Sequence, residues 1–235
     1  MKKSLSIIIP VLNEELNIKP LTNKIIKTLK KYKFEIIFVD DSSTDNSKKI
    51  LKKLKSKYPF FKPIFRTKKR DLSKSCFDGI KKSKYKNILI MDGDLQHDPK
   101  FIPHMLGKYI KNNLDLVVGA RKLYKPNNPG LSETRRFASL ILINLFSFFN
   151  IKTKDPMSGF FLFKKKIFTK NKKRYFGKGF KILADIIINS KPSLKTEDVY
   201  IDFKRRYENE SKMNYKILLI LINFYLVSLI KKLFI

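Results

Sequence analysis

The sequence predicts an α/β fold in which a mostly parallel sheet is flanked by helices. Short apolar runs that fit buried strands alternate with longer segments whose apolar residues recur at helical spacing. A β-α-β-α order of this kind is typical of a parallel sheet with helices on both faces. With 43% hydrophobic residues among 235, the chain can also bury the core that such a domain needs.

The alternation is clearest in the first half of the chain. We expect strands at residues 5–9, 34–39, 64–65, 87–91 and 116–118. We expect helices at residues 14–32, 45–58, 73–83 and 101–112. Asn13 is the expected N-cap of the first helix, and Pro99 occupies a helix N1 position before the last of them.

The second half is less regular. Residues 125–130 have the composition of a loop. We expect helices at 134–150 and 180–189, and strands at 157–163 and 199–203. The segment 212–235 is strongly apolar.

This apolar segment is expected to lie in a membrane interface as a helix. Its longest uncharged run, 217–230, is shorter than the roughly 20 apolar residues that a spanning helix needs. Lysines flank the run on both sides, as is typical of interfacial helices: Lys212, Lys216, Lys231 and Lys232. A true membrane span is the alternative, whereas a core helix is disfavoured because almost every face is apolar.

The formal charge of +32 would ordinarily indicate a nucleic acid or an anionic membrane as partner. Only eight of the 52 basic residues are arginine, however, and Ile, Asn and Phe are abundant. That mixture suggests an AT-rich codon bias, so much of the lysine is expected to be solvated surface. The arginines are more informative, because arginine grips phosphate bidentately. Cys76, the only cysteine, excludes an intrachain disulfide.

Asp92-Gly93-Asp94 closes the apolar strand at 87–91. Side chains at i and i+2 of an extended segment point to one side, and open α/β sheets bind ligands at the carboxyl ends of their strands. The two carboxylates can therefore reach one hard cation and leave room for phosphate oxygens. An acidic turn after a strand is the alternative, and this motif alone does not decide between them.

A series of further motifs, taken in order, resembles family 2 glycosyltransferases. Residues 9–15, Ile-Pro-Val-Leu-Asn-Glu-Glu, are similar to the opening motif of that family. Residues 37–45 resemble its nucleotide-binding motif. Residues 91–99, Met-Asp-Gly-Asp-Leu-Gln-His-Asp-Pro, resemble its metal motif in the form found in dolichol- or polyprenyl-phosphate mannose or glucose synthases.

Segments of the second half resemble the same subfamily. They are Gly119-Ala120-Arg121, the pair Arg135 and Ser139, and residues 155–160, 179–182 and 203–213. The chain departs from the pattern at Asp71 and Asn209, where the family usually has Gly, and at Asp185, where it often has Glu. None of these departures removes an implied metal or phosphate ligand.

The resemblance implies a GT-A fold with a Rossmann-type sheet over residues 1–211. A nucleotide-sugar half would cover about 1–120 and an acceptor half about 121–211, followed by the membrane-associated segment 212–235. The implied activity is the inverting transfer of mannose or glucose from GDP-mannose or UDP-glucose to a dolichyl or undecaprenyl phosphate, at the cytoplasmic face of the cell membrane.

The resemblance also implies which residues of the matching motifs bind the metal, the nucleotide sugar and the acceptor. Mg²⁺ or Mn²⁺ would be held by Asp92, Asp94 and Gln96, and the catalytic residues would be Asp92, Asp94, Arg121 and Arg206. The nucleotide sugar would contact Pro10, Asn13, Glu14, Val39, Asp40, Asp41, Asp92, Arg206 and Lys212. The acceptor phosphate would contact Arg121, Arg135 and Ser139. For Ser43, Thr44 and Asp45 we favour a helix-capping role, and for His97 packing beside the metal loop.

Two other interpretations differ in the partner. A family 2 enzyme could instead add sugar to a saccharide hydroxyl in cell-surface polysaccharide synthesis, which needs a general base; Asp185 is the candidate. A nucleic-acid partner is not expected, because the arginines fall within the glycosyltransferase motifs. A separate membrane protein, such as a flippase or a downstream transferase, is compatible with the first interpretation.

Overall fold

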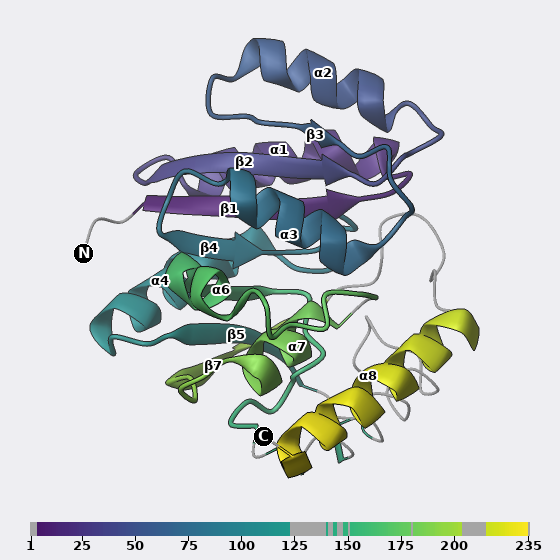
Figure 1. The fold of residues 1–235 in the computed structure, drawn as a ribbon. Coiled ribbons are helices and arrows are strands. Elements are labelled where there is room, and N and C mark those ends of the chain that lie inside the picture. The colour runs from purple at the N-terminus through teal and green to yellow at the C-terminus, as the bar shows by residue number, and fades with distance from the viewer. Residues whose placement is uncertain are drawn as a thin grey trace.

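The computed structural model describes residues 4–122, 140, 143–144, 148–149, 151–179, 181–203 and 215–234. In these residues one seven-stranded sheet has the order β3-β2-β1-β4-β6-β5-β7 (Figure 1). Its strands are β1 (Ser4–Val11), β2 (Lys33–Asp40), β3 (Ile64–Phe65), β4 (Asn87–Ile90), β5 (Leu116–Arg121), β6 (Phe161–Lys164) and β7 (Thr196–Ile201).

The predicted mostly parallel sheet is confirmed, with one strand running the other way. Strand β6 lies between β4 and β5 and is antiparallel to both, whereas the other pairs of neighbours are parallel. The sequence did not predict this insertion. It brings a strand from the second half of the chain beside β4, which carries Asp92 and Asp94 at its end.

Helices cover both faces of the sheet. They are α1 (Glu15–Thr28), α2 (Ser47–Lys57), α3 (Leu72–Lys82), η1 (Pro99–Phe101), α4 (Ile102–Lys111), α6 (Lys165–Asn171), α7 (Ile182–Asn189) and α8 (Tyr215–Phe234). Alternate residues of β1 serve separate cores: Ile7 and Ile9 pack with α1, α2 and α4, whereas Ile8 packs with α3, α6 and α7. This alternation explains why the central strands are apolar throughout. Cys76 is buried in the second core.

Several local expectations were wrong. Asn13 does not cap α1; it has a φ of +55°, and its side-chain oxygen accepts a hydrogen bond from Thr44 N–H. Ser43 and Thr44 are therefore bonded to the loop after β1 and do not cap α2. Asp45 does accept a hydrogen bond from Ser47 N–H at the start of α2.

The second half differs from expectation in its element boundaries. The strand expected at 157–163 begins only at Phe161, because Ser158 N–H bonds back to Asp155 C=O in a turn. Helix α6 was not expected. The loop expected at 125–130 lies outside the described residues, as does most of the helix expected at 134–150.

Helix α8 packs beside α7 (Figure 1), and part of its surface is exposed. Phe224 is buried with Ala184 of α7 and Met157. Ile222, Leu226 and Ile230 remain 48%, 50% and 56% exposed. Within the part of the chain that the structure describes, none of the helices has the length and apolarity that crossing a membrane requires.

Candidate active site

The two carboxylates of the Asp-Gly-Asp segment lie in the loop that follows β4, at the carboxyl end of the sheet. Asp94 is buried, and its Oδ1 accepts a hydrogen bond from Gln96 N–H at 3.2 Å. The side chain of Asp92 is 38% exposed. Leu95 turns the loop with a φ of +63°, and Gln96 is buried behind it.

Gly159 approaches the Asp92 carboxylate from the turn before β6. A Cβ atom at this position would lie 2.2 Å from Oδ2 of Asp92. Only glycine fits here, so the backbone of this turn packs directly against the carboxylate. Asp92 is partly exposed beside the buried Asp94, and a pair of carboxylates fits a hard divalent cation, which prefers oxygen ligands. The described residues contain no cluster of three or more His, Cys, Asp or Glu side chains that could ligate a metal, so this pair would share the ion with other ligands.

His97 packs beside this loop, as predicted. Its ring lies 5.3 Å from Phe160 and 5.1 Å from Phe203, measured between centroids. Burial lowers its pKa to about 4, against the opposing charge of Asp94. The imidazole is therefore neutral at physiological pH and fills space between the rings.

Arg121 ends β5 and forms a buried ion pair with Asp155. Its Nε and Nη2 donate to the two carboxylate oxygens at 2.7 and 2.8 Å, and its backbone N–H donates to Oδ2 at 3.1 Å. Burial alone raises the pKa of Asp155, but the Arg121 charge outweighs it and holds that pKa below the ordinary range. Asp155 thus fixes the guanidinium plane, while Nη1 bonds to no described residue.

The partner of Asp155 was not predicted, although this residue lies within the motif at 155–160. Only the topology reveals the contact, because the turn before β6 follows β5 by more than thirty residues. The charge of Asp92 also acts on Arg121 and raises its pKa, as does that of Asp155. The Asp92 carboxylate and the Arg121–Asp155 ion pair are therefore electrostatically linked.

The loops after β1 and β2 meet on the other side of the Asp-Gly-Asp segment. Pro10 of β1 lies opposite Val39 of β2 in the sheet register. Asn13 N–H donates to Ser43 Oγ at 2.9 Å, and Glu14 N–H donates to Ser47 Oγ at 3.0 Å. These bonds hold the predicted donor-binding residues together at the carboxyl end of the sheet.

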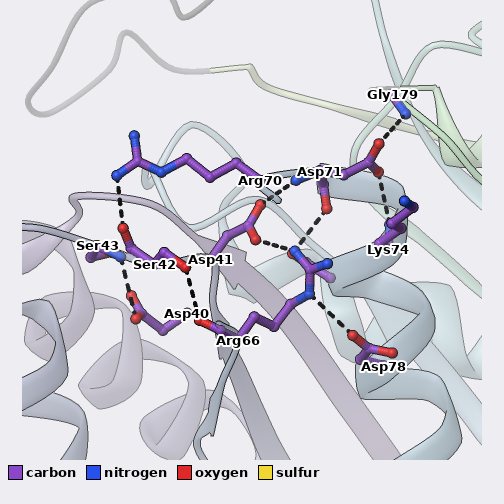
Figure 2. Close-up of polar contacts among 11 residues, drawn as sticks. Asp40, Asp41, Ser42, Ser43, Arg66, Arg70, Asp71, Lys74, Asp78 and Gly179 are labelled. Carbon is purple, nitrogen blue, oxygen red and sulfur yellow. Dashed lines mark hydrogen bonds and ion pairs between the residues drawn. The ribbon is translucent and has the colours of Figure 1, made fainter. Parts of the chain in front are cut away.

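The two aspartates at the end of β2 have different surroundings. Both oxygens of Asp41 are bonded, one to the Arg66 guanidinium and the other to Asp71 N–H at 2.7 Å (Figure 2). Burial raises the pKa of Asp41 against the effect of these partners. Asp40 is 2% exposed, and its Oδ1 has no hydrogen-bond partner among the described residues. A buried acceptor without a partner is costly, so Asp40 suits a ligand donor better than Asp41 does.

Asp71 joins the donor loops to the second half of the chain (Figure 2). Its Oδ1 caps α3 by accepting from Lys74 N–H at 3.0 Å, and its Oδ2 accepts from Gly179 N–H at 2.9 Å. Ser73 Oγ donates to the Gly179 carbonyl at 2.9 Å. A carboxylate thus links the start of α3 to the segment before α7.

We expect Asp71→Ala to lower the free energy of unfolding by about 1.5 kcal/mol, since it removes a helix cap and an additional backbone link. Asp71→Asn retains one acceptor oxygen and should lose about half as much. Urea denaturation followed by circular dichroism measures both. Equal losses in the two variants would mean that the bond kept by the asparagine oxygen contributes nothing to stability and would contradict the expectation.

Some predicted site residues cannot be placed. Arg135, Ser139, Arg206 and Lys212 lie outside the described residues. The structure therefore brings together Asp92, Asp94, Gln96 and Arg121 near the carboxyl end of β4, with Pro10 on β1, Asn13 in the loop after it, and Val39 and Asp40 on β2.

Comparison with known proteins identifies the family. Residues 6–171 match the family described as glycosyl transferase family 2. The chain belongs to glycosyl transferase family 2. This confirms the resemblance drawn from the motifs at 9–15, 37–45 and 91–99.

The relatives of this family 2 chain include proteins named dolichol-phosphate mannosyltransferase. The one from Pyrococcus furiosus is 35% identical over 90% of this chain, which spans 59% of that protein. The one from Saccharomyces cerevisiae is 31% identical over 91% of this chain and 82% of that protein. The chain therefore spans about three fifths of the first relative's length.

The fold of this family 2 chain is also seen in solved structures. Glucosyl-3-phosphoglycerate synthase from Mycobacterium tuberculosis, in complex with Mn²⁺, UDP-glucose and glycerol 3-phosphate, superposes with a TM-score of 0.70 at 16% identity. The match covers 97% of this chain and 79% of that one. It supports a GT-A-like architecture.

Proposed function

We propose that this chain transfers a hexose, mannose or glucose, from a nucleotide sugar to a polyprenyl phosphate with inversion of configuration. The observation that carries the proposal is the Asp92–Asp94 pair after β4, with Asp92 partly exposed and the Arg121 guanidinium close enough to interact electrostatically. Relatives at 35% and 31% identity that are named dolichol-phosphate mannosyltransferases support the acceptor class.

The donor would lie across the ends of β1, β2 and β4. Asp40, with its unpartnered Oδ1, would accept a hydrogen bond from the base or ribose of GDP-mannose or UDP-glucose. Asp92, Asp94 and Gln96 would hold Mg²⁺ or Mn²⁺ against the diphosphate. When bound, the cation supplies Lewis-acid neutralisation of the charge that develops on the leaving diphosphate. The Mn²⁺ in the mycobacterial synthase supports a divalent metal.

The acceptor phosphate would bind beside Arg121. A phosphate monoester is anionic at neutral pH, so its oxygen attacks the anomeric carbon without a strong general base. The protein must instead hold two phosphates close together, which requires fixed cations. Asp155 orients the Arg121 guanidinium for this task. Arg135 and Ser139 would complete the acceptor site, and Arg206 and Lys212 would contact the donor diphosphate.

The hydroxyl-acceptor alternative gains no support from Asp185. This carboxylate is 3% exposed, and its oxygens accept hydrogen bonds from Phe176 N–H, Gly177 N–H and the Asn189 amide. It stabilises the loop before α7. A general base needs an oxygen within reach of the substrate hydroxyl.

The proposal assigns residues 1–211 to catalysis and 212–235 to the membrane surface. The exposed apolar residues of α8 suit a helix that lies in the interface at the cytoplasmic face. A polyprenyl phosphate presents its headgroup at such a surface, which is where a peripheral enzyme can reach it. A membrane protein partner is compatible with this position.

The acceptor chemistry can be tested by comparing undecaprenyl phosphate with undecaprenol, which carries a hydroxyl instead of the phosphate. We expect sugar transfer to the phosphate and none above background to the alcohol, because the site supplies cations and not a base. Chromatography of the lipid products from a radiolabelled donor measures both. Comparable transfer to the alcohol would contradict the proposed mechanism.

A further inference from the structure

His97 is a buried side chain whose polar atoms have no role in the mechanism above. It is 1% exposed, and neither Nδ1 nor Nε2 has a hydrogen-bond partner among the described residues. Packing against Phe160 and Phe203 accounts for the ring but not for its nitrogens. A buried polar group without a partner costs free energy, which a phenylalanine ring of similar shape would avoid.

A carboxylate oxygen lies close to this ring. Oδ2 of Asp92 is 3.5 Å from Nδ1 of His97. This separation is just beyond the usual range of a hydrogen bond, so a small rotation of the carboxylate would close it. A neutral imidazole carries a single N–H, and a carboxylate oxygen can only accept. The contact therefore favours the tautomer in which Nδ1 carries the hydrogen.

The orientation of the Asp92 carboxylate also depends on its other neighbours. A Cβ atom at Gly159 would lie 2.2 Å from Oδ2 and 2.6 Å from Oδ1, so the turn before β6 packs against both oxygens. The Arg121 guanidinium is close enough for the charge of Asp92 to raise its pKa. A guanidinium attracts a carboxylate and competes with a metal ion for it, unless another group holds the carboxylate in place.

We propose that His97 is a positioning residue whose Nδ1–H donates to Oδ2 of Asp92 and holds that carboxylate in the orientation that binds the divalent cation. Carboxylates that ligate metals are themselves hydrogen-bonded, and loss of such a partner typically costs about 10–100-fold in metal affinity. The inference rests on the proposed function, because it requires Asp92 to be a metal ligand.

The tautomer of His97 can be measured directly, because the chain contains only two histidines. Nitrogen–proton correlation NMR of the full chain, labelled in histidine, shows which ring nitrogen carries the hydrogen. His104→Gln removes the other histidine, which is exposed on α4, and so assigns the signals. We expect the Nδ1–H form for His97 near neutral pH, both without metal and with Mg²⁺. The Nε2–H form would overturn the proposal.

Two variants separate positioning from packing. His97→Phe keeps a ring but loses the donor, whereas His97→Asn keeps a donor near the place of Nδ1 but loses the ring. We expect His97→Phe to weaken Mn²⁺ binding at least about tenfold while its Tm stays at or above the wild-type value. His97→Asn should bind Mn²⁺ within about threefold of the wild type although its Tm falls. Electron paramagnetic resonance of free Mn²⁺ gives the affinity, and thermal unfolding gives Tm.

The opposite pattern would mean that the ring only packs. His97→Phe would then bind Mn²⁺ like the wild type and His97→Asn would bind it more weakly, which would overturn the proposal and leave the proposed function intact. Asp94→Asn is the reference for loss of the cation site. If the wild type bound Mn²⁺ no better than Asp94→Asn, the cation site itself would be wrong, and with it the metal-dependent mechanism.

Discussion

Replacement of Asp94 by asparagine is expected to lower the rate of sugar transfer at least about 100-fold. The substitution keeps the size of the side chain and its bond from Gln96 N–H, but removes one of the two negative charges that would hold the divalent cation. Leaving-group stabilisation would then be lost, while the fold should persist because the asparagine keeps the oxygen that accepts from Gln96 N–H. Initial rates at saturating donor and metal measure the effect.

The matched control is Glu197→Gln on β7. This carboxylate lies at the edge of the sheet and contacts Lys108 and Asn112 of α4. The control should transfer sugar at the wild-type rate. If Asp94→Asn retains more than a tenth of wild-type activity, the assignment of this carboxylate to the metal is wrong.

Replacement of Asp155 by asparagine is expected to destabilise the protein by about 3 kcal/mol, because it leaves the buried Arg121 charge without its counter-ion. For a chain of this size that loss lowers Tm by roughly 6–12 °C. Thermal unfolding measures it, again beside Glu197→Gln, whose Tm should remain close to the wild type. A Tm within about 2 °C of the wild type would contradict the structural role of the pair.

The same pair predicts how stability depends on pH. The pKa of Asp155 is lowered in the folded state, so its contribution is complete above the unfolded-state value of about 3.9. It is lost as the pH falls through the depressed folded-state pKa. The stability difference between the wild type and Asp155→Asn should therefore be constant above about pH 4 and shrink below it.

Much of the fold could be predicted because its signals are local. The apolar runs of β1, β2 and β4 are continuous, as expected of strands covered by helices on both faces. The Asp92–Asp94 pair could be found for a similar reason, because both residues follow one strand. Their proposed role in holding a cation depends on two carboxylates that are close together in the sequence.

The features that the sequence left unpredicted depend on distant contacts. The antiparallel position of β6 follows from pairing with β4 and β5, which no local pattern encodes. Likewise Arg121 was recognised as a phosphate-binding candidate, but its buried partner Asp155 was not. Asn13 was misassigned as a cap because its side chain bonds across to Thr44, thirty-one residues further on.

The most direct test of the account is sugar transfer by the purified full chain in detergent. Radiolabelled GDP-mannose and UDP-glucose would be offered separately with undecaprenyl phosphate, before and after chelation with EDTA. We predict lipid-extractable label from at least one donor, its loss on chelation and its return on adding Mn²⁺ or Mg²⁺. Unlabelled lipid with both donors, together with transfer to added saccharides, would contradict the account.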